Sequence, residues 1–154
     1  MLKKKIIIFL LLFLSSCGYE AIHSKKNVKY FEFSISKLSF SGDRDVNLKI
    51  KEILNNYTLN KKDKDFTLKI SSTSEKKILA KNILGDATSF QKIIVVNMEV
   101  LENNKFKNNL TFSEKFTYSN NNDKFNLTTY EKEIIKNLTE TIVDKLIFKL
   151  SNIQ

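Results

Sequence analysis

The sequence of 154 residues contains no proline, one cysteine, one histidine and three glycines. A single cysteine excludes a disulfide-stapled scaffold, and so few glycines without any proline exclude a collagen-like or low-complexity chain. The remaining composition is 42% hydrophobic and 28% charged, which together with the length predicts one folded domain of ordinary size.

Residues that carry catalysis are also scarce. One cysteine and one histidine, His23, leave no material for a Cys/His nucleophile or a zinc site. No glycine-rich phosphate loop occurs, and Glu131 with Glu133 is typical of a helix start rather than of an acid–base pair. We therefore expect a binding or scaffolding module rather than an enzyme, with no catalytic residue, no metal and no cofactor.

The formal net charge is +9, and 25 of the 26 basic residues are lysine. Asparagine and isoleucine are abundant too, which indicates a compositional drift of the whole chain rather than a binding signal. Three of the lysines lie in an N-terminal segment that we expect to be removed, which leaves +6. Because that segment directs export, we expect no nucleic-acid partner.

The N-terminal segment has the pattern of a bacterial lipoprotein signal. Residues 1–5 are basic, residues 6–14 form an apolar run too short to span a bilayer, and Leu14-Ser15-Ser16-Cys17 follows directly. An aliphatic residue, two small residues and then cysteine resemble the lipobox, in which the cysteine thiol accepts a diacylglyceryl group. The alternative is a plain secretory signal followed by an accidental cysteine.

This pattern predicts three parts of the chain. Residues 1–16 are the signal peptide, residues 17–28 a lipidated tether that begins at Cys17, and residues 29–154 a single domain. His23 lies in the tether and is expected to be a bystander rather than a ligand. Gly18 after the cysteine is compatible with sorting to the outer membrane, so we expect a lipid anchor on its periplasmic side.

The rest of the chain alternates between strand and helix patterns. Period-two alternation predicts strands at residues 31–35, 66–70, 87–101 and 110–118. A stripe at helical spacing predicts a helix over residues 43–57, with Asp43 or Ser41 as its cap, and this stripe consists of Val46, Ile50, Ile53, Leu54 and Tyr57. A capping box from Thr128 to Glu131 predicts a last helix with an inner stripe of Ile135, Leu138, Ile142, Leu146 and Leu150.

Loops are expected between these elements. Residues 74–86, which close with Gly85 and Asp86, and residues 119–127 read as loops, and the asparagine pairs at 103–104 and 108–109 flank a turn region. Each strand has one apolar and one polar face, and two amphipathic helices can bury their stripes only on the apolar side of one sheet. The predicted fold is therefore α+β, a two-layer sandwich with two helices packed on one face of a four-stranded sheet.

The opposite face of this sheet is expected to be polar except for Ile93 and Val95. Two interpretations stay open for this pair. A loop shields them, or they contact a partner.

The layout resembles a known family. Six features resemble the family of the lipopolysaccharide-assembly lipoprotein LptE over residues 17–150. They are the lipobox, Cys17-Gly18-Tyr19, a strand near the start, the polar break into the first helix, a long hairpin entered through the Gly-containing loop at residues 84–90, and the terminal helix. The resemblance implies a lipoprotein that plugs the outer-membrane β-barrel LptD, assists its assembly and takes part in lipopolysaccharide delivery. It also implies lipopolysaccharide contacts near two loops, where the matching residues are Lys81 and Lys124; the alternative is that both are ordinary solvated lysines.

Two other functions stay open. One is a free-standing, periplasmic-facing lipoprotein that binds a small ligand or a cell-wall component, and the other is a surface lipoprotein with an adhesive role. This chain also differs from better-known LptE members in its short C-terminus, its lack of proline and its use of lysine for arginine.

Overall fold

The computed structural model describes residues 33–59 and 61–153. The elements are, in chain order, β1 (Phe33–Gly42), α2 (Arg44–Leu54), the 3₁₀ turn η2 (Asn55–Tyr57), β2 (Lys64–Lys81), β3 (Ala87–Glu102), β4 (Lys105–Ser119) and α3 (Lys124–Ser151). The predicted signal peptide and tether, with Cys17 and His23, lie outside the described residues.

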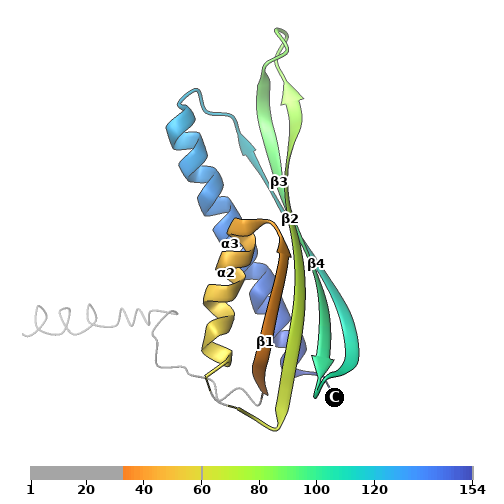
Figure 1. Cartoon of the computed structure of the whole chain (residues 1–154). Helices are drawn as coiled ribbons and strands as arrows, with labels where there is room; N and C mark the ends of the chain where they lie inside the picture. Colours follow the sequence, from red (N-terminus) through yellow and green to blue (C-terminus); the bar gives the residue numbers. More distant parts are fainter. Residues whose placement is uncertain (1–32, 60, 154) are drawn as a thin grey trace, which may run out of the picture. The chain divides into compact units, whose positions relative to one another are not determined.

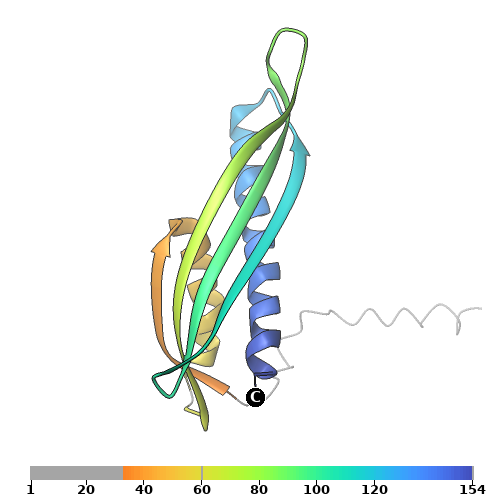
Figure 2. The ribbon, with the colours of Figure 1, turned by 90° about the vertical axis from the view of Figure 1, so that its right-hand side faces the viewer.

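The four strands form one sheet in the order β1-β2-β3-β4 (Figure 1). β1 and β2 are parallel and are connected through α2, whereas β2–β3 and β3–β4 are antiparallel hairpins. In Figure 2 the sheet faces the viewer, with both helices behind it. The predicted α+β class, with two helices on one face of a four-stranded sheet, is confirmed.

The hydrophobic core lies between the sheet and the helices. Its fully buried members include Ile50 and Leu54 of α2, Leu68 of β2, and Leu146 and Leu150 of α3. The even positions of β3 are buried as predicted: Phe90, Ile94, Val96, Met98 and Val100. A second, smaller cluster joins the start of β3 and the end of β4 to the start of α3, and it consists of Phe90, Tyr118, Leu127 and Ile134.

β1 contains a bulge that its sequence requires. The apolar residue after Ile35 is Leu38, three positions later, so a regular strand would place these two side chains on opposite faces. The pairing with β2 shifts by one residue between Ile35 and Lys37. Ile35 and Leu38 therefore stand opposite Phe66 and Leu68, and the apolar side of β1 stays on the helix side of the sheet.

α2 begins at the predicted cap. The Asp43 carboxylate accepts hydrogen bonds from the backbone N–H groups of Asp45, at 3.1 Å, and Val46, at 3.0 Å. These bonds satisfy two of the amides that a helix start leaves without partners. The predicted stripe is also confirmed, because Val46, Ile50 and Leu54 are buried while Ile53 and Tyr57 pack against the core.

α3 begins earlier than the sequence predicts. Its cap is Asp123, whose carboxylate accepts from the N–H groups of Phe125 and Asn126, so the expected cap at Thr128 is wrong. Thr128 instead donates its hydroxyl to the carbonyl of Lys124 at 2.8 Å, inside the helix. The earlier start brings one more turn of helix against the sheet.

The buried side of α3 is also broader than predicted. Ile142, Leu146 and Leu150 are buried as expected, whereas Ile135 and Leu138 are only partly buried. The other buried residues of this helix are Leu127, Ile134, Thr139 and Val143. The Thr139 hydroxyl donates to the Ile135 carbonyl at 2.7 Å, which makes its burial inexpensive.

The expected loop at residues 74–86 is wrong. β2 continues through most of it and pairs with β3 as far as Lys81, which stands opposite Ala87. Only residues 82–86 turn, where the Asn82 side-chain oxygen accepts from the N–H groups of Leu84 and Asp86 at 2.9 Å each. The turn and the strand ends beside it extend past both helices (Figure 1), so the pairing of β2 with β3 stabilises this end of the hairpin without a packed face.

The β3–β4 connection is shorter than expected. Asn103 and Asn104 form a two-residue turn with φ of 50° and 64°, values that asparagine adopts more readily than most residues. β4 begins directly afterwards at Lys105, so residues 108–109 lie within the strand rather than in a turn region.

Candidate functional site

The face of the sheet that the helices leave uncovered is polar. Alternation along the strands places on it the following side chains: Ser39, Ser41, Lys69, Ser71, Thr73, Gln91, Asn97, Glu99, Asn109, Thr111, Ser113, Lys115 and Thr117. A shallow groove of about 560 Å³ crosses all four strands in the half of this face nearer the β3–β4 turn. Among the described elements, only strands contribute to it.

Hydrogen bonds across neighbouring strands organise this polar face. The Lys69 ammonium lies 2.8 Å from the Glu99 carboxylate, and the Thr111 hydroxyl donates to the Asn97 side-chain oxygen at 2.9 Å. Both pairs lie on the rim of the groove and are solvent-exposed, so they contribute little to stability. What they provide is a row of donors and acceptors that a polar partner surface can pair with.

Ile93 and Val95 lie on this polar face and are partly buried. Glu75 and Lys115 stand opposite Ile93 on the two neighbouring strands, so the apolar pair lies among polar side chains. No described turn covers this face: the two hairpin turns lie at the ends of the sheet, and the turn from β1 into α2 lies on the helix side (Figure 1).

The second candidate region is the hairpin end, which we define as the turn at residues 82–86, the adjoining ends of β2 and β3, and the start of α3. Lys81 is exposed at the last pair of β2, and Lys124 is the exposed first residue of α3. The loop before α3 is fixed to the hairpin, because the Asn120 backbone N–H donates to the Thr88 carbonyl at 2.9 Å and its side-chain amide donates to the Ala87 carbonyl at 2.8 Å.

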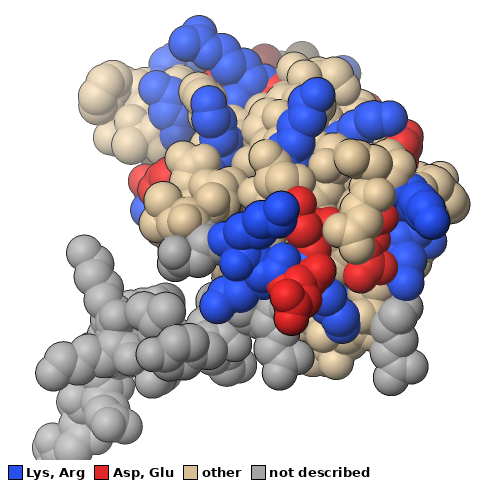
Figure 3. Space-filling model, turned by 60° about the horizontal axis from the view of Figure 1, so that its bottom comes forward, with Lys and Arg blue, Asp and Glu red and all other residues tan. Residues whose placement is uncertain are grey.

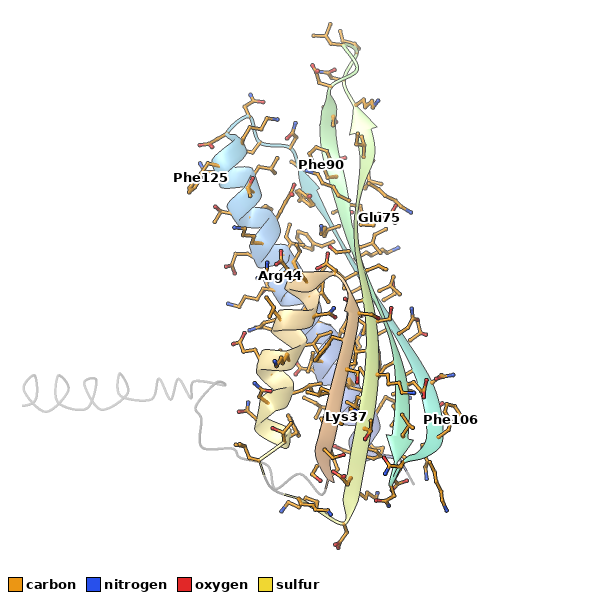
Figure 4. The ribbon with its side chains drawn as sticks, in the orientation of Figure 1. Lys37, Arg44, Glu75, Phe90, Phe106 and Phe125 are labelled. Atoms are coloured by element: carbon orange, nitrogen blue, oxygen red, sulfur yellow. The ribbon has the colours of Figure 1, made fainter. Side chains whose placement is uncertain are left out.

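The hairpin end also exposes large apolar side chains that sequence patterns did not single out. Ile83 is 102% exposed and Leu84 is 82% exposed, while Ile78 and Leu79 are about half exposed. Figure 4 shows the hairpin extending beyond the rest of the domain. Phe125, at the start of α3, adds a further exposed ring. The sequence feature that could have indicated this surface is the presence of two Ile-Leu pairs, at residues 78–79 and 83–84, in a lysine-rich stretch without the alternation typical of a buried face.

A charged, hydrogen-bonded network next to the hairpin end connects the start of α3 to strands β2 and β4. The Glu131 carboxylate accepts from the Lys76 ammonium at 2.5 Å and from the Tyr118 hydroxyl at 2.8 Å. Lys76 also lies 3.9 Å above the centre of the Phe90 ring. These partners lie far from Glu131 in the chain. The capping-box pattern, which is local, therefore could not predict them.

This network shifts the pKa values of Glu131 and Tyr118. Burial opposes ionisation of Glu131, but the hydrogen bonds from Lys76 and Tyr118 outweigh it and hold the pKa of Glu131 below its ordinary value. Burial, reinforced by the hydrogen bond to Glu131, raises the pKa of Tyr118. Both groups therefore keep their pairing over the whole neutral range.

A cavity of about 720 Å³ opens beside this network. Its lining consists of Tyr118, Ser119, Asn120, Asn121, Asn122, Asn126, Leu127 and Tyr130. Within the part of the chain that the structure describes, the buried side-chain oxygen of Asn120 has no hydrogen-bond partner. The walls thus combine amide groups with two tyrosine rings.

Over residues 33–59 and 61–153, no three His, Cys, Asp or Glu side chains come together as metal ligands. No helix in the same residues has the length and apolar character needed to cross a bilayer. The two candidate regions are thus a hydrogen-bonding sheet face and a hairpin end with exposed apolar and lysine side chains.

Comparison with known proteins identifies the fold only. No family model and no curated protein sequence matches this chain. The chain is similar in structure to the rare lipoprotein B of Shewanella oneidensis, with a TM-score of 0.55 and 14% identity over 75% of this chain and 97% of that one. It is also similar to an uncharacterised lipoprotein B of Nitrosomonas europaea, with a TM-score of 0.56 and 13% identity over 79% and 86% of the two chains.

A minor lipoprotein of Acinetobacter baumannii has the same arrangement, with a TM-score of 0.53 and 13% identity over 75% of this chain and 90% of that one. The described domain thus has a fold that solved bacterial lipoproteins also have.

Proposed function

We propose that this chain is an outer-membrane lipoprotein of the LptE type, acylated at Cys17 and attached to the periplasmic side of the membrane. In this proposal it plugs the β-barrel LptD, assists the assembly of that barrel, and takes part in delivering lipopolysaccharide to the outer leaflet. The observation that carries the proposal is the uncovered polar face of the sheet, on a fold that solved bacterial lipoproteins also have.

The polar face suits the inside of a barrel. The lumen of an outer-membrane barrel is lined with polar side chains and water, so a plug needs hydrogen-bonding groups more than apolar area. Serine, threonine and asparagine side chains dominate the polar face, and the apolar faces of both helices are already buried in the core. Ile93 and Val95 would then contact the barrel wall among these polar groups.

The length of the hairpin supports the same interpretation. β2 contains 18 residues, which at about 3.3 Å per residue extend about 59 Å. A bilayer with its headgroups is about 40–45 Å thick. A domain of this length, held inside a barrel, can extend from one surface of the membrane to the other.

The hairpin end is the proposed lipopolysaccharide contact. Lys81 and Lys124 would pair as point charges with phosphates and carboxylates of the glycolipid. Ile83 and Leu84 are exposed two and three residues after Lys81, which fits a ligand that carries acyl chains next to its charged groups. No bond is made or broken in this mechanism, because the protein only positions the glycolipid.

The alternative is a free-standing lipoprotein that binds a small ligand or a cell-wall component. The cavity beside Asn120 favours it, because amide groups and tyrosine rings bind polar small molecules and sugars.

Copurification separates these two functions. After detergent extraction of membranes, tagged protein acylated at Cys17 is expected to bring down one large integral outer-membrane protein in a stable complex. Recovery of the acylated protein alone would contradict the LptD proposal and favour the free-standing lipoprotein. Mass spectrometry of the same sample tests the acyl group, and an unmodified Cys17 would contradict the anchor.

The glycolipid contact has its own test. Changing Lys81→Glu together with Lys124→Glu is expected to weaken lipopolysaccharide binding at low salt, because both sites then repel the anionic glycolipid. The difference from the unchanged protein should shrink at high salt, since exposed charges are screened within about 10 Å at 0.1 M. Identical binding curves at both salt concentrations would remove these lysines from the site.

A further inference from the structure

The end of the domain opposite the hairpin end has its own surface chemistry. We call it the basal end: the starts of β1 and β2 with residues 61–63 before β2, the turn at Asn103 and Asn104 with its flanking residues, and the last turn of α3. Phe33 at the start of β1 stands opposite Lys64 at the start of β2. The Lys64 ammonium in turn donates to the carbonyl of Ile153 at 2.9 Å, so the end of α3 lies beside them.

Two phenylalanine rings are exposed at the basal end. Phe106 is 63% exposed and Phe148 is 68% exposed, and Figure 4 shows Phe106 next to the β3–β4 turn. Phe148 lines a groove of about 350 Å³ between the start of β4 and the end of α3, together with Lys107, Lys149 and Ile153. Exposed aromatic rings beside lysine side chains are typical of proteins that lie at a membrane surface.

The charge of the basal end is positive. Its lysines are Lys61, Lys62, Lys64, Lys105, Lys107 and Lys149, and its acidic residues are Asp63, Asp65 and Glu102. Figure 3 looks towards this end and shows lysine side chains around a smaller acidic group. The ion pair of Lys107 with Glu102, at 3.1 Å, uses one of these lysines. The surface therefore complements an anionic partner.

We propose that the basal end rests on the surface of an anionic phospholipid bilayer, with Phe106 and Phe148 among the headgroups and the lysines against the phosphates. The inference rests on the acylation of Cys17 in the proposed function, and it goes beyond that function by assigning a second membrane contact to the folded domain. Cys17 precedes Phe33 by 16 residues, and the chain enters the domain at the basal end. The basal end is thus the part of the domain closest to the anchor along the chain.

A second contact changes how the domain stands on the membrane. An acyl anchor alone leaves the orientation of the domain open, whereas an anchor combined with a basic patch fixes one end against the lipid. In protein that the barrel does not yet enclose, the long axis of the sheet then points away from the anchoring leaflet, and both the polar face and the hairpin end stay accessible.

Fluorescence quenching tests this orientation. The chain has no tryptophan, so one introduced tryptophan is the only indole. The lipidated protein with Phe148→Trp is reconstituted into vesicles of phosphatidylethanolamine and phosphatidylglycerol, with or without bromine on the upper acyl carbons of the phosphatidylglycerol. We expect at least a twofold loss of emission in the brominated vesicles.

Two other positions serve as matched controls. Leu48→Trp on the exposed side of α2 and Ile83→Trp at the hairpin end replace residues that are also exposed, and their emission is expected to be equal in both kinds of vesicle. Equal emission from Phe148→Trp, in protein that floats with the vesicles, overturns the basal contact and leaves the proposed function standing. Protein that does not float overturns both, and stronger quenching at Ile83→Trp overturns the orientation.

Charge substitutions test the lysines. With the indole of the Phe148→Trp variant as the reporter, Lys105→Gln together with Lys149→Gln is expected to weaken the membrane contact about fivefold per lysine. The matched pair Lys51→Gln and Lys136→Gln, exposed on the two helices, is expected to leave the quenching unchanged. Equal losses from both pairs would overturn a specific role of the basal lysines.

Discussion

Gly42 is the position where a single methyl group has the largest predictable effect. It ends β1 with φ of +90°, and a Cβ atom there would lie 1.9 Å from the backbone carbonyl oxygen of Ser72. That carbonyl also accepts the N–H of Asp43 at 3.0 Å, so it is fixed at the start of α2. Gly42→Ala is expected to lower the free energy of unfolding by at least about 3 kcal/mol.

Gly85 is the matched control. Its φ is +89°, yet no atom lies within 4 Å of the position of a Cβ. Gly85→Ala therefore carries only the cost of the left-handed backbone, about 1–2 kcal/mol. Urea unfolding of both variants measures how much stability each one loses. Equal unfolding midpoints would show that contact between a Cβ at residue 42 and the Ser72 carbonyl does not destabilise the domain.

Glu131 gives the domain a predictable response to acid. Since its pKa in the folded protein is lower than the ordinary 4.5, its carboxylate stabilises the fold above that pH, and this contribution is lost as the pH falls through the folded pKa. Glu131→Gln should therefore be less stable than the unchanged protein at pH 7, with the gap closing below pH 4.5. A gap independent of pH, measured by thermal unfolding, would contradict this role of the charge.

At the scale of the element, α3 depends on its buried leucines. Leu146→Asp places an unpaired charge where a fully buried leucine packs against the sheet, and is expected to cost several kcal/mol, enough to unfold a domain of ordinary stability. Lys115→Glu on the polar face should leave folding intact. Thermal unfolding compares the two, and equal melting temperatures would show that the two faces of the sheet are assigned wrongly.

The elements that bury one face are the ones that sequence patterns predict well. The apolar stripe of α2 and the alternation along β3 could be predicted because each element has one face in the core and the other towards solvent. Residues 75–81 of β2 have no such contrast, because all of them are exposed. Local sequence patterns predict a loop there, although the strand pairs with β3 as far as Lys81, with two register shifts after Ile78.

The start of α3 was misplaced for a related reason. Asp123 and Thr128 are both good helix caps, and local sequence does not choose between them. The choice depends on Leu127, which joins Phe90 and Tyr118 in a cluster built from three separate parts of the chain. Contacts of that kind are not visible in local patterns.

The candidate surfaces were likewise predictable only where local sequence patterns determine them. The polar face could be predicted, because it is the complement of a well-defined apolar face. Lys81 and Lys124 were assigned through a resemblance, and the structure places both at the hairpin end. The exposed apolar residues beside Lys81 and the network around Glu131 depend on long-range pairing, so periodicity could not find them.

At the scale of the whole molecule, each surface has one task in the proposed function. The helix layer forms the core, the hairpin end meets glycolipid, and the polar face meets the barrel wall. The proposed contact of the basal end with phospholipid belongs to the lipoprotein before the barrel encloses it. This division requires the polar face to be covered in the assembled state while the outer sides of the helices contact the partner less.

Site-specific photo-crosslinking in cells measures that division directly. A photoreactive residue at Ile93, at the centre of the polar face, is expected to capture one large outer-membrane β-barrel, identified as LptD by mass spectrometry. The same residue at Lys51, on the exposed side of α2, should capture it less often. Absence of any barrel product at Ile93, or equal capture at both positions, would contradict the proposal that the polar face lies against the lumen of LptD.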